Sequence, residues 1–210
     1  MRFRVGEVRA RLVPEALTKR FKIVAIAASA GGLAALRSIV TGLPADFGAI
    51  VLVLQHVDPR HVSLMPQLIG RNSKLPVAHA EDGVKVQAGH VYVAPPDRHM
   101  LVNADGTLSL TRTELVNYVR PSADLLFESV AAAFGARAIA VVLTGAGHDG
   151  ARGVTAIKER GGTVLAQDEA SSEFFSMPSA AIQTGSVDQV VSLDEMSGAI
   201  VKLVAGEVPA

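Results

Sequence analysis

The chain has 210 residues, of which 49% are hydrophobic, so it can bury one core as a domain of ordinary size. Its 20 basic and 20 acidic residues cancel, and aromatic residues make up only 4%, which argues against nucleic acid as a partner. Cysteine is absent, which excludes disulfides and thiol chemistry. No apolar run reaches the roughly 18 residues of a membrane span, and we see no signal-peptide core, so we expect a cytoplasmic protein without membrane insertion.

The beginning of the chain differs in charge from the remainder. Residues 1–20 hold six basic and two acidic residues, a composition typical of a solvated extension or linker. We therefore predict an extension over residues 1–20, one folded catalytic domain over residues 21–205, and a short tail over residues 206–210.

Apolar runs of strand length recur along the chain and alternate with segments of helical pattern. Runs that are apolar at every position predict parallel strands buried on both faces; they span residues 22–28, 49–55, 138–145, 162–168 and 189–193. The helical segments span residues 32–43, 61–72, 122–134, 151–160, 178–183 and 194–204. Asp194 is the predicted N-cap of the last helix, and Gly135 and Gly161 are predicted helix stops. This alternation predicts an α/β fold with a doubly wound, mostly parallel sheet and helices on both faces in three layers.

One region departs from this alternation. Residues 89–112, "GHVYVAPPDRHMLVNADGTLSLTR", contain strand patterns around a Pro-Pro turn and an Asp105-Gly106 turn signal. We predict an antiparallel hairpin here, at one edge of the parallel sheet.

Three polar residues follow predicted strands at the edge where open α/β sheets place their functional groups. Ser29 follows the first strand, His56 the second, and Asp149 the run that ends in "TGAGHDG". A serine hydroxyl becomes a good nucleophile when an imidazole takes its proton, and a carboxylate can orient that imidazole. The stretch "AASAG" is also close to the G-x-S-x-G nucleophile elbow, with Ala27 in place of the first glycine. The Gly31-Gly32 pair allows a tight turn with backbone amides directed at an oxyanion.

Each of these residues also has a structural interpretation. Ser29 can form a turn or cap a helix, His56 can be a hydrogen-bonded loop histidine, and Asp149 can cap the helix that follows Gly150. A phosphate-binding loop would use the same glycines, but neither G-x-x-x-x-G-K-[ST] nor G-x-G-x-x-G is present. From the pattern alone, a Ser-His-Asp hydrolase and a purely structural set of residues both stay open.

The other histidines give no metal-binding pattern. The candidate ligands lack the spacing of a helical zinc motif, so we predict no metal; they are His56, Asp58, His61, His79, His90, His99 and His148. His148 competes for the base role but is adjacent to Asp149, and the side chains of neighbours usually diverge. We expect His99 to line the cleft or hold the hairpin, and Ser122 to cap its helix.

Six stretches resemble the catalytic domain of the chemotaxis protein-glutamate methylesterases, the CheB family. They lie in family order between about Lys22 and Leu203; they are "AASAGG", "QHVDPRHVS", "GHVYVAPPDRHM", "RPSADLLFESVA", "VVLTGAGHDGARG" and "QDEASSEFFSMPSAAI". The resemblance implies hydrolysis of glutamyl methyl esters on the cytoplasmic helices of chemoreceptors, with release of methanol and without a cofactor. It also allows deamidation of receptor glutamines. The family's catalytic residues fall on Ser29, His56 and Asp149.

The resemblance implies that an oxyanion sits on backbone amides near Ala30 and Gly31, with help from the Ala146-Gly147 loop. Alanine at 146 replaces a methionine that is common in the family motif, which bears on the fit of the substrate. Family members often carry a receiver domain, and the residues before Lys22 are too few for one, so a separate or deleted receiver is an expected partner. A CheB-like binding module with weak catalysis and an esterase that acts outside chemotaxis are the alternatives.

Overall fold

Seven parallel strands form the central sheet of the computed structural model, which describes residues 22–58 and 63–206. In spatial order the strands are β3 (Val77–His79), β4 (Val91–Val93), β2 (Ile50–Gln55), β1 (Ile23–Ala28), β7 (Ala138–Val142), β8 (Thr163–Gln167) and β9 (Gln189–Val191). From β1 the chain forms β2 and the edge strand β3, places β4 between these two, and then returns to add β7, β8 and β9 on the other side of β1. The reversal beside β1 creates the switch point at which open α/β sheets bind their ligands.

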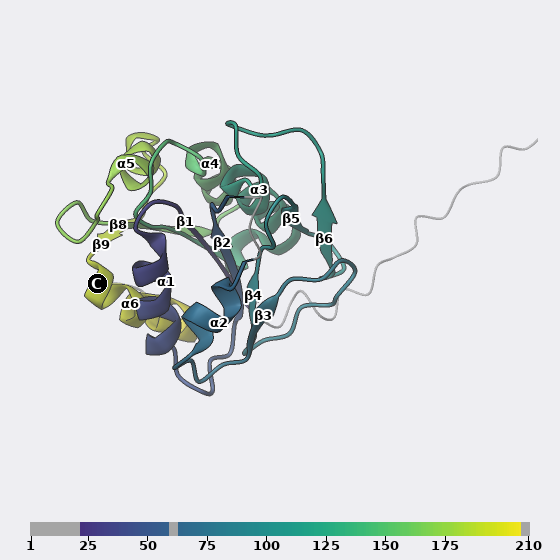
Figure 1. Ribbon diagram of the computed structural model, residues 1–210. Helices are drawn as coiled ribbons and strands as arrows, with labels where there is room; N and C mark the ends of the chain where they lie inside the picture. The colour runs from purple at the N-terminus through teal and green to yellow at the C-terminus, as the bar shows by residue number, and fades with distance from the viewer. Residues whose placement is uncertain (1–21, 59–62, 207–210) are drawn as a thin grey trace, which may run out of the picture.

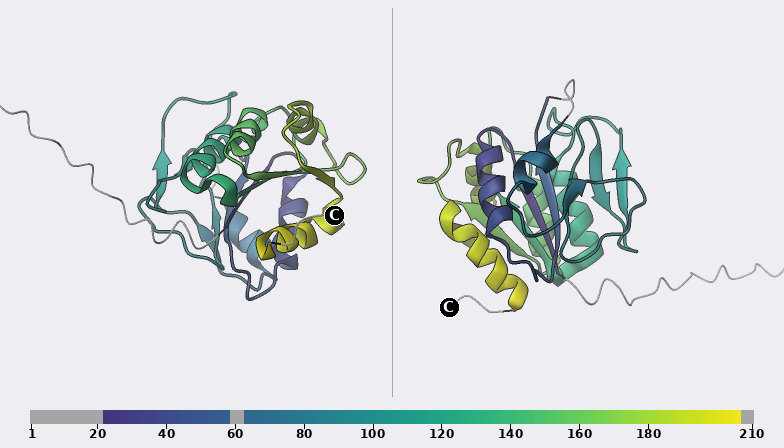
Figure 2. Two further views of the ribbon diagram at one scale, coloured as in Figure 1. Left: turned by 180° about the vertical axis from the view of Figure 1, so that it is seen from behind. Right: turned by 60° about the horizontal axis from the view of Figure 1, so that its bottom comes forward.

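Helices cover both faces of this sheet (Figure 1). One face packs against α1 (Gly32–Gly42), α2 (Met65–Gly70) and α6 (Leu193–Ala205). The other packs against α3 (Ala123–Phe134), α4 (Ala151–Glu159) and α5 (Ser176–Gln183), with a 3₁₀ turn (Gly135–Arg137) after α3. Two further views show the same three layers from behind and from below (Figure 2).

The alternation of side chains along β1 explains why its sequence is apolar throughout. Ile23, Ala25 and Ala27 belong to the core beneath α3, α4 and α5. Their neighbours along the strand belong to the core on the opposite face, beneath α1 and α6. Since successive strand residues point to opposite faces, a strand covered on both sides must be apolar at every position. The predicted three-layer, doubly wound fold is confirmed.

The predicted hairpin is present as a separate two-stranded antiparallel sheet, β5 (His99–Val102) and β6 (Leu108–Thr111). Its turn uses Asp105, whose carboxylate accepts the Thr107 amide at 3.0 Å, and Gly106, whose φ is +80°. The hairpin packs against α3. Strand β4, from the same stretch of sequence, instead joins the main sheet in parallel beside β2, and the edge strand β3 was not predicted.

The boundaries of several helices differ from the prediction, and α5 begins at Ser176 rather than at residue 178. Helix α6 begins after Ser192, whose hydroxyl donates to Glu195 at 2.7 Å, so Ser192 and not Asp194 occupies the N-cap position. Helix α2 is shorter than the predicted segment, of which residues 61 and 62 lie outside the described part of the chain. The predicted stops are confirmed, since Gly135 and Gly161 follow their helices with positive φ. The predicted extension, residues 1–20, lies outside the described residues, as do residues 207–210 of the tail predicted over residues 206–210. Within the described residues, no helix has the length and hydrophobicity to cross a membrane.

Candidate active site

Three loops at the carboxyl edge of the sheet hold the predicted catalytic residues. Ser29 follows β1, His56 follows β2, and Asp149 lies between β7 and α4. Strand β1 pairs with both β2 and β7, so these loops leave the sheet side by side. The Ser29 amide donates to the Thr144 carbonyl at 3.0 Å, and the His56 amide donates to the Ala28 carbonyl at 3.1 Å. The backbone thus ties the three loops together where the sheet ends.

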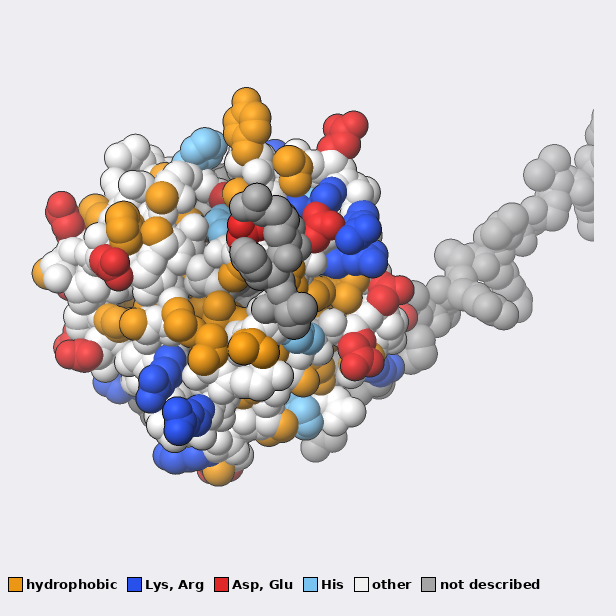
Figure 3. Space-filling view, viewed as in Figure 1, with side chains coloured by type: hydrophobic (Ala, Val, Ile, Leu, Met, Phe, Trp, Pro, Cys, Tyr) orange, Lys and Arg blue, Asp and Glu red, His pale blue; other side chains and the backbone are white. Residues whose placement is uncertain are grey.

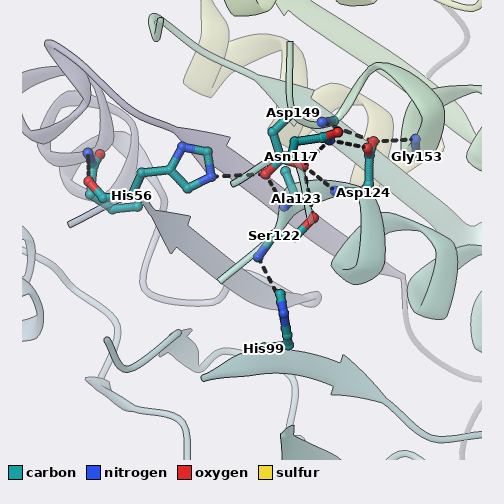
Figure 4. Close-up of polar contacts among 10 residues, drawn as sticks. His56, His99, Asn117, Ser122, Ala123, Asp124, Asp149 and Gly153 are labelled. Atoms are coloured by element: carbon teal, nitrogen blue, oxygen red, sulfur yellow. Dashed lines mark hydrogen bonds and ion pairs between the residues drawn. The ribbon is translucent and has the colours of Figure 1, made fainter. Parts of the chain in front are cut away.

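His56 and Asp149 form a direct pair (Figure 4). The ring Nε2 of His56 lies 2.9 Å from Oδ2 of Asp149, and the two side chains are only 12% and 4% exposed. A carboxylate only accepts hydrogen bonds, so Nε2 carries the hydrogen and Nδ1 keeps a free lone pair. The imidazole is therefore held in the tautomer of a base, with Nδ1 as the basic atom.

The carboxylate of Asp149 lies at the N-terminus of α3 and is surrounded by donors. Its Oδ2 also accepts the Ala123 amide at 2.6 Å. Its Oδ1 accepts the Ser122 hydroxyl at 2.9 Å, the Asp124 amide at 3.2 Å and the Asn117 side-chain amide at 3.4 Å. The unpaired amides at a helix N-terminus favour a negative charge, so this position stabilises Asp149 in its ionised form.

Neither Ser122 nor Asp149 caps the helix that the sequence analysis predicted for it. Ser122 stands at the N-cap of α3, but its hydroxyl donates to Asp149 and not to its own helix. Asp149 precedes α4, whose N-cap is Gly150, and accepts amides from α3. In return, Asp124 of α3 accepts the Gly150 and Gly153 amides of α4, at 3.0 and 2.8 Å. The loop before α4 thus places a carboxylate at the start of α3, and α3 places one at the start of α4.

Hydrogen bonds lower the pKa of Asp149. Burial by itself would raise the pKa of this carboxyl. The hydrogen bonds from His56, the Ala123 amide and the Ser122 hydroxyl, together with the electrostatic attraction of His56, lower it, so the pKa lies below the ordinary value of 3.8. The carboxylate is therefore charged at neutral pH and can stabilise an imidazolium.

Asp149 should make the stability of the protein depend on pH in the acid range. A carboxyl with a lowered folded-state pKa contributes stability above the unfolded-state value of 3.8, and that contribution is lost as the pH falls through the folded-state pKa. We expect the free energy of unfolding of wild type to fall more steeply below about pH 4 than that of Asp149→Asn. Urea unfolding of both proteins between pH 7 and about 2.5 measures this. Parallel curves would contradict it.

Close packing around Ser29 leaves room only for glycine at position 145. A Cβ at Gly145 would lie 2.9 Å from Cβ of Ser29 and 2.3 Å from Sδ of Met177. Among the described residues, every hydrogen bond of Ser29 uses its backbone, so its hydroxyl is not tied to another group. Such a hydroxyl is available as a nucleophile, and the hydrogen bond to a catalytic base often forms only with substrate bound.

Two short segments beside Ser29 present backbone amides. Gly31 has φ +75° and is the N-cap of α1, and Gly147 has φ +91° in the loop after β7. Within the described part of the chain, the amides of Ala30, Gly31, Ala146 and Gly147 donate no hydrogen bond to another backbone group. Backbone amides at the start of a helix and in an open loop can stabilise an anionic oxygen.

A cavity of about 510 Å³ opens beside Ser29 at the start of α1. It offers a carboxylate, a guanidinium and apolar surface next to the hydroxyl; its lining residues are Ser29, Gly31, Gly32, Leu33, Ala34, Arg37, Gln55 and Glu173. The Glu173 side chain lies against Gly31, since a Cβ there would approach its Oε2 to 2.7 Å.

Several polar residues of the site were not singled out by the sequence analysis. Gln167 ends β8, and its Oε1 accepts the Thr144 amide at 2.8 Å, which fixes the loop that follows β7. Gln55 ends β2 in the same way. Gln167 and Gln55 could each have been found as a polar residue at the end of an apolar strand. Asn117 lies in the loop before α3 and donates to Asp124 as well as Asp149, and no local pattern marks it.

His99, His79 and His148 have structural or exposed positions, and His61 lies outside the described residues. His99 is fully buried and does not line the cavity: its Nδ1 accepts the Ser122 amide and its Nε2 bonds the Glu114 carbonyl, which holds the hairpin to α3. The ring of His79 lies between two backbone carbonyls, with Nε2 at 3.1 Å from the Ser63 oxygen and Nδ1 at 3.4 Å from the Val93 oxygen. His148 is exposed beside Asp149. No cluster of three metal-ligating side chains occurs among the described residues.

A family model described as CheB methylesterase matches residues 24–200, a range that includes all three loops. The chain belongs to the CheB methylesterase family. The catalytic domain of CheB methylesterase from Thermotoga maritima has a similar structure, with a TM-score of 0.85 and 36% identity over 88% of this chain and 99% of that one. The confirmed membership agrees with the resemblance of the six sequence stretches.

Curated relatives of this CheB-family chain differ in length. A putative protein-glutamate methylesterase/protein-glutamine glutaminase from Leptospira interrogans is 37% identical over 183 residues, which cover 87% of this chain and 95% of that protein. A protein-glutamate methylesterase/protein-glutamine glutaminase from Myxococcus xanthus is 41% identical over 88% of this chain but only 52% of its own length. The chain thus spans nearly all of the first relative and about half of the second.

Proposed function

We propose that this protein is a serine esterase that removes methyl groups from glutamyl methyl esters on the cytoplasmic helices of chemoreceptors. Residues 21–205 are its catalytic domain, and the reaction takes place in the cytoplasm. The observation that carries the proposal is the largely buried His56–Asp149 pair, which lies at the same edge of the sheet as Ser29. The hydroxyl of Ser29 makes no hydrogen bond to any residue that the structure describes. The names of the relatives specify the ester.

The proposed reaction has two halves. In the first, Oγ of Ser29 attacks the glutamyl carbonyl while Nδ1 of His56 takes its proton, and the imidazolium is stabilised by Asp149 through Nε2. The tetrahedral intermediate collapses, the bond to the methoxy oxygen breaks, and methanol leaves with the proton from His56. In the second, water gives a proton to His56 and its oxygen attacks the acyl-enzyme, which releases the glutamate side chain and restores Ser29.

The oxyanion of each intermediate sits, in this proposal, on backbone amides near Ala30 and Gly31, with a contribution from Ala146 and Gly147. The observation that supports this is the lack of a backbone acceptor for these amides among the described residues. Amides that need no reorganisation are effective at stabilising developing charge.

An exposed apolar rim supports a helix as the substrate. Leu33 lines the cavity and is 39% exposed, while Phe174, whose carbonyl accepts the Gly145 amide, is 44% exposed. Figure 3 shows hydrophobic side chains spread across the middle of one face of the molecule. An amphipathic receptor helix would bury such side chains when it presents its ester to Ser29.

The names of the relatives also favour a second activity on the same substrate. We propose that the same residues deamidate receptor glutamines, with ammonia in the place of methanol. A receiver domain is the proposed regulatory partner.

Methanol release from a methylated chemoreceptor fragment tests the proposed function. We expect the wild-type chain to release methanol from the methylated fragment and none from the unmethylated fragment, measured by headspace gas chromatography. Ammonia release from a fragment with glutamine at the same positions tests deamidation. A folded wild-type chain that binds the fragment but releases neither product would favour the alternative, a binding module.

A further inference from the structure

The last residue of β2 lies between the proposed nucleophile and the proposed base. Gln55 is 7% exposed, and its amide nitrogen donates to the Ser29 carbonyl at 2.7 Å and to the His56 carbonyl at 3.0 Å. One NH₂ group therefore uses both of its hydrogens on the backbones of the two residues that must meet. None of the family motifs discussed above assigns it a role.

The orientation of this amide is fixed by what it faces. If the amide were flipped, so that Oε1 and Nε2 changed places, its oxygen would face two carbonyl oxygens and find no donor. In the observed orientation Oε1 is buried, and no donor among the described residues reaches it. It packs against Gly32, where a Cβ would come within 2.2 Å of it. The side chain thus makes two donated bonds while its oxygen stays unsatisfied, which is unusual for a buried amide and marks a position worth explaining.

The two carbonyls lie just beyond the end of regular strand pairing. The ladder between β1 and β2 ends at the pair Ala28 and Gln55, and one further backbone bond joins the His56 amide to the Ala28 carbonyl. After that point the chains separate into α1 and the loop before α2. The Gln55 side chain adds a bond across to the Ser29 carbonyl, where the backbone offers none, and so extends the link between the strands by one residue. Its second bond, to the His56 carbonyl, lies within its own segment.

We infer that Gln55 is a positioning residue that sets the separation of Ser29 and His56. This inference rests on the proposed roles of these two residues as nucleophile and base. Because the Ser29 carbonyl also accepts the Gly32 amide at 2.9 Å, the peptide that leads into the nucleophile turn is held from two sides. When the two carbonyls are fixed, the Cα atoms that carry the hydroxyl of Ser29 and the imidazole of His56 are fixed as well. This matters because a small displacement of a reacting group lowers the reaction rate by a large factor.

The test compares wild type with Gln55→Met, which has a similar length and no donor, and Gln55→Glu, whose carboxylate keeps the shape but repels both carbonyls. We expect kcat for methanol release to fall roughly 10- to 100-fold, with KM changed by less than about twofold. Crystal structures should show the Ser29 and His56 carbonyl oxygens farther apart in the variant. If Gln55→Met does not fold, Gln55→Glu supplies both measurements.

Ser129→Ala is the matched control for a loss of stability. The Ser129 hydroxyl also links two backbone groups, since it donates to the Leu126 carbonyl and accepts the Val102 amide, but it lies under the hairpin. We expect this variant to lose stability and keep kcat. The inference is overturned if the carbonyls of Gln55→Met stay in place, or if its kcat falls no more than that of the control. If wild type releases no methanol, the proposed function fails, and the crystal structures alone decide whether Gln55 holds the two backbones.

Discussion

Ser29→Ala is expected to reduce the rate of methanol release by roughly 10⁴- to 10⁶-fold while leaving the melting temperature unchanged. The rate should fall because the acyl-enzyme cannot form without Oγ. The stability should hold because the hydroxyl makes no hydrogen bond to a described residue, and alanine keeps the Cβ that packs beside Gly145.

The measurement is methanol release from a methylated receptor fragment, with circular dichroism melting of the same preparations. Ser179→Ala serves as the control, because its hydroxyl only accepts a bond from Gln183 on the exposed side of α5. A Ser29→Ala protein that works at the wild-type rate would show that the nucleophile is a different residue. Receptor binding by this variant, measured by pull-down, should persist.

Asp149→Asn is expected to reduce kcat by roughly 10⁴-fold and, unlike Ser29→Ala, to lower the stability as well. An asparagine at position 149 can donate an N–H to Nε2 of His56. The imidazole then carries its hydrogen on Nδ1, the atom that must accept the proton of Ser29. Both carboxylate oxygens accept from donors, Oδ2 from the Ala123 amide and Oδ1 from the Ser122 hydroxyl, so an NH₂ group at either position meets a donor. We expect a loss of about 1–3 kcal/mol at neutral pH.

The matched control is Asp188→Asn, far from the cavity. Asp188 also accepts a backbone amide, from Val164 at 2.8 Å, and pairs with Lys158. We expect it to lose stability without loss of methanol release. Urea unfolding and steady-state kinetics on both variants separate the two effects. An Asp149→Asn protein with unchanged kcat would remove the carboxylate from the mechanism.

Much of the fold followed from the sequence because the relevant signals are local. A strand covered by helices on both faces must be apolar at each position, so β1, β2, β7 and β8 were recognisable as runs. The helix ends at Gly135 and Gly161 were predictable because helices often end at a residue with positive φ, which glycine adopts readily. The edge strand β3 has three residues and is only partly buried, so it carried too weak a pattern to be predicted.

The proposed catalytic residues were also accessible from the sequence, for a topological reason. In a parallel sheet the carboxyl ends of neighbouring strands meet at one edge, so a polar residue after each apolar run identifies a shared location. Ser29, His56 and Asp149 were selected by this rule, and the structure brings His56 and Asp149 into direct contact. Their chemical roles remain proposals that the variants above test.

The sequence by itself therefore determined the strand pattern, the α/β class and the loops that hold the site, since each depends on neighbours along the chain. Only the tertiary structure decided that Asp149 lies at the start of α3 and not α4, that Nε2 of His56 is the atom it binds, and that the Gln55 amide donates to the carbonyls of both Ser29 and His56. These contacts join residues that are far apart in the sequence or depend on where one side chain points. Their geometry is fixed by how β1, β2 and β7 pair and how α3 packs on α4, and no local pattern encodes it.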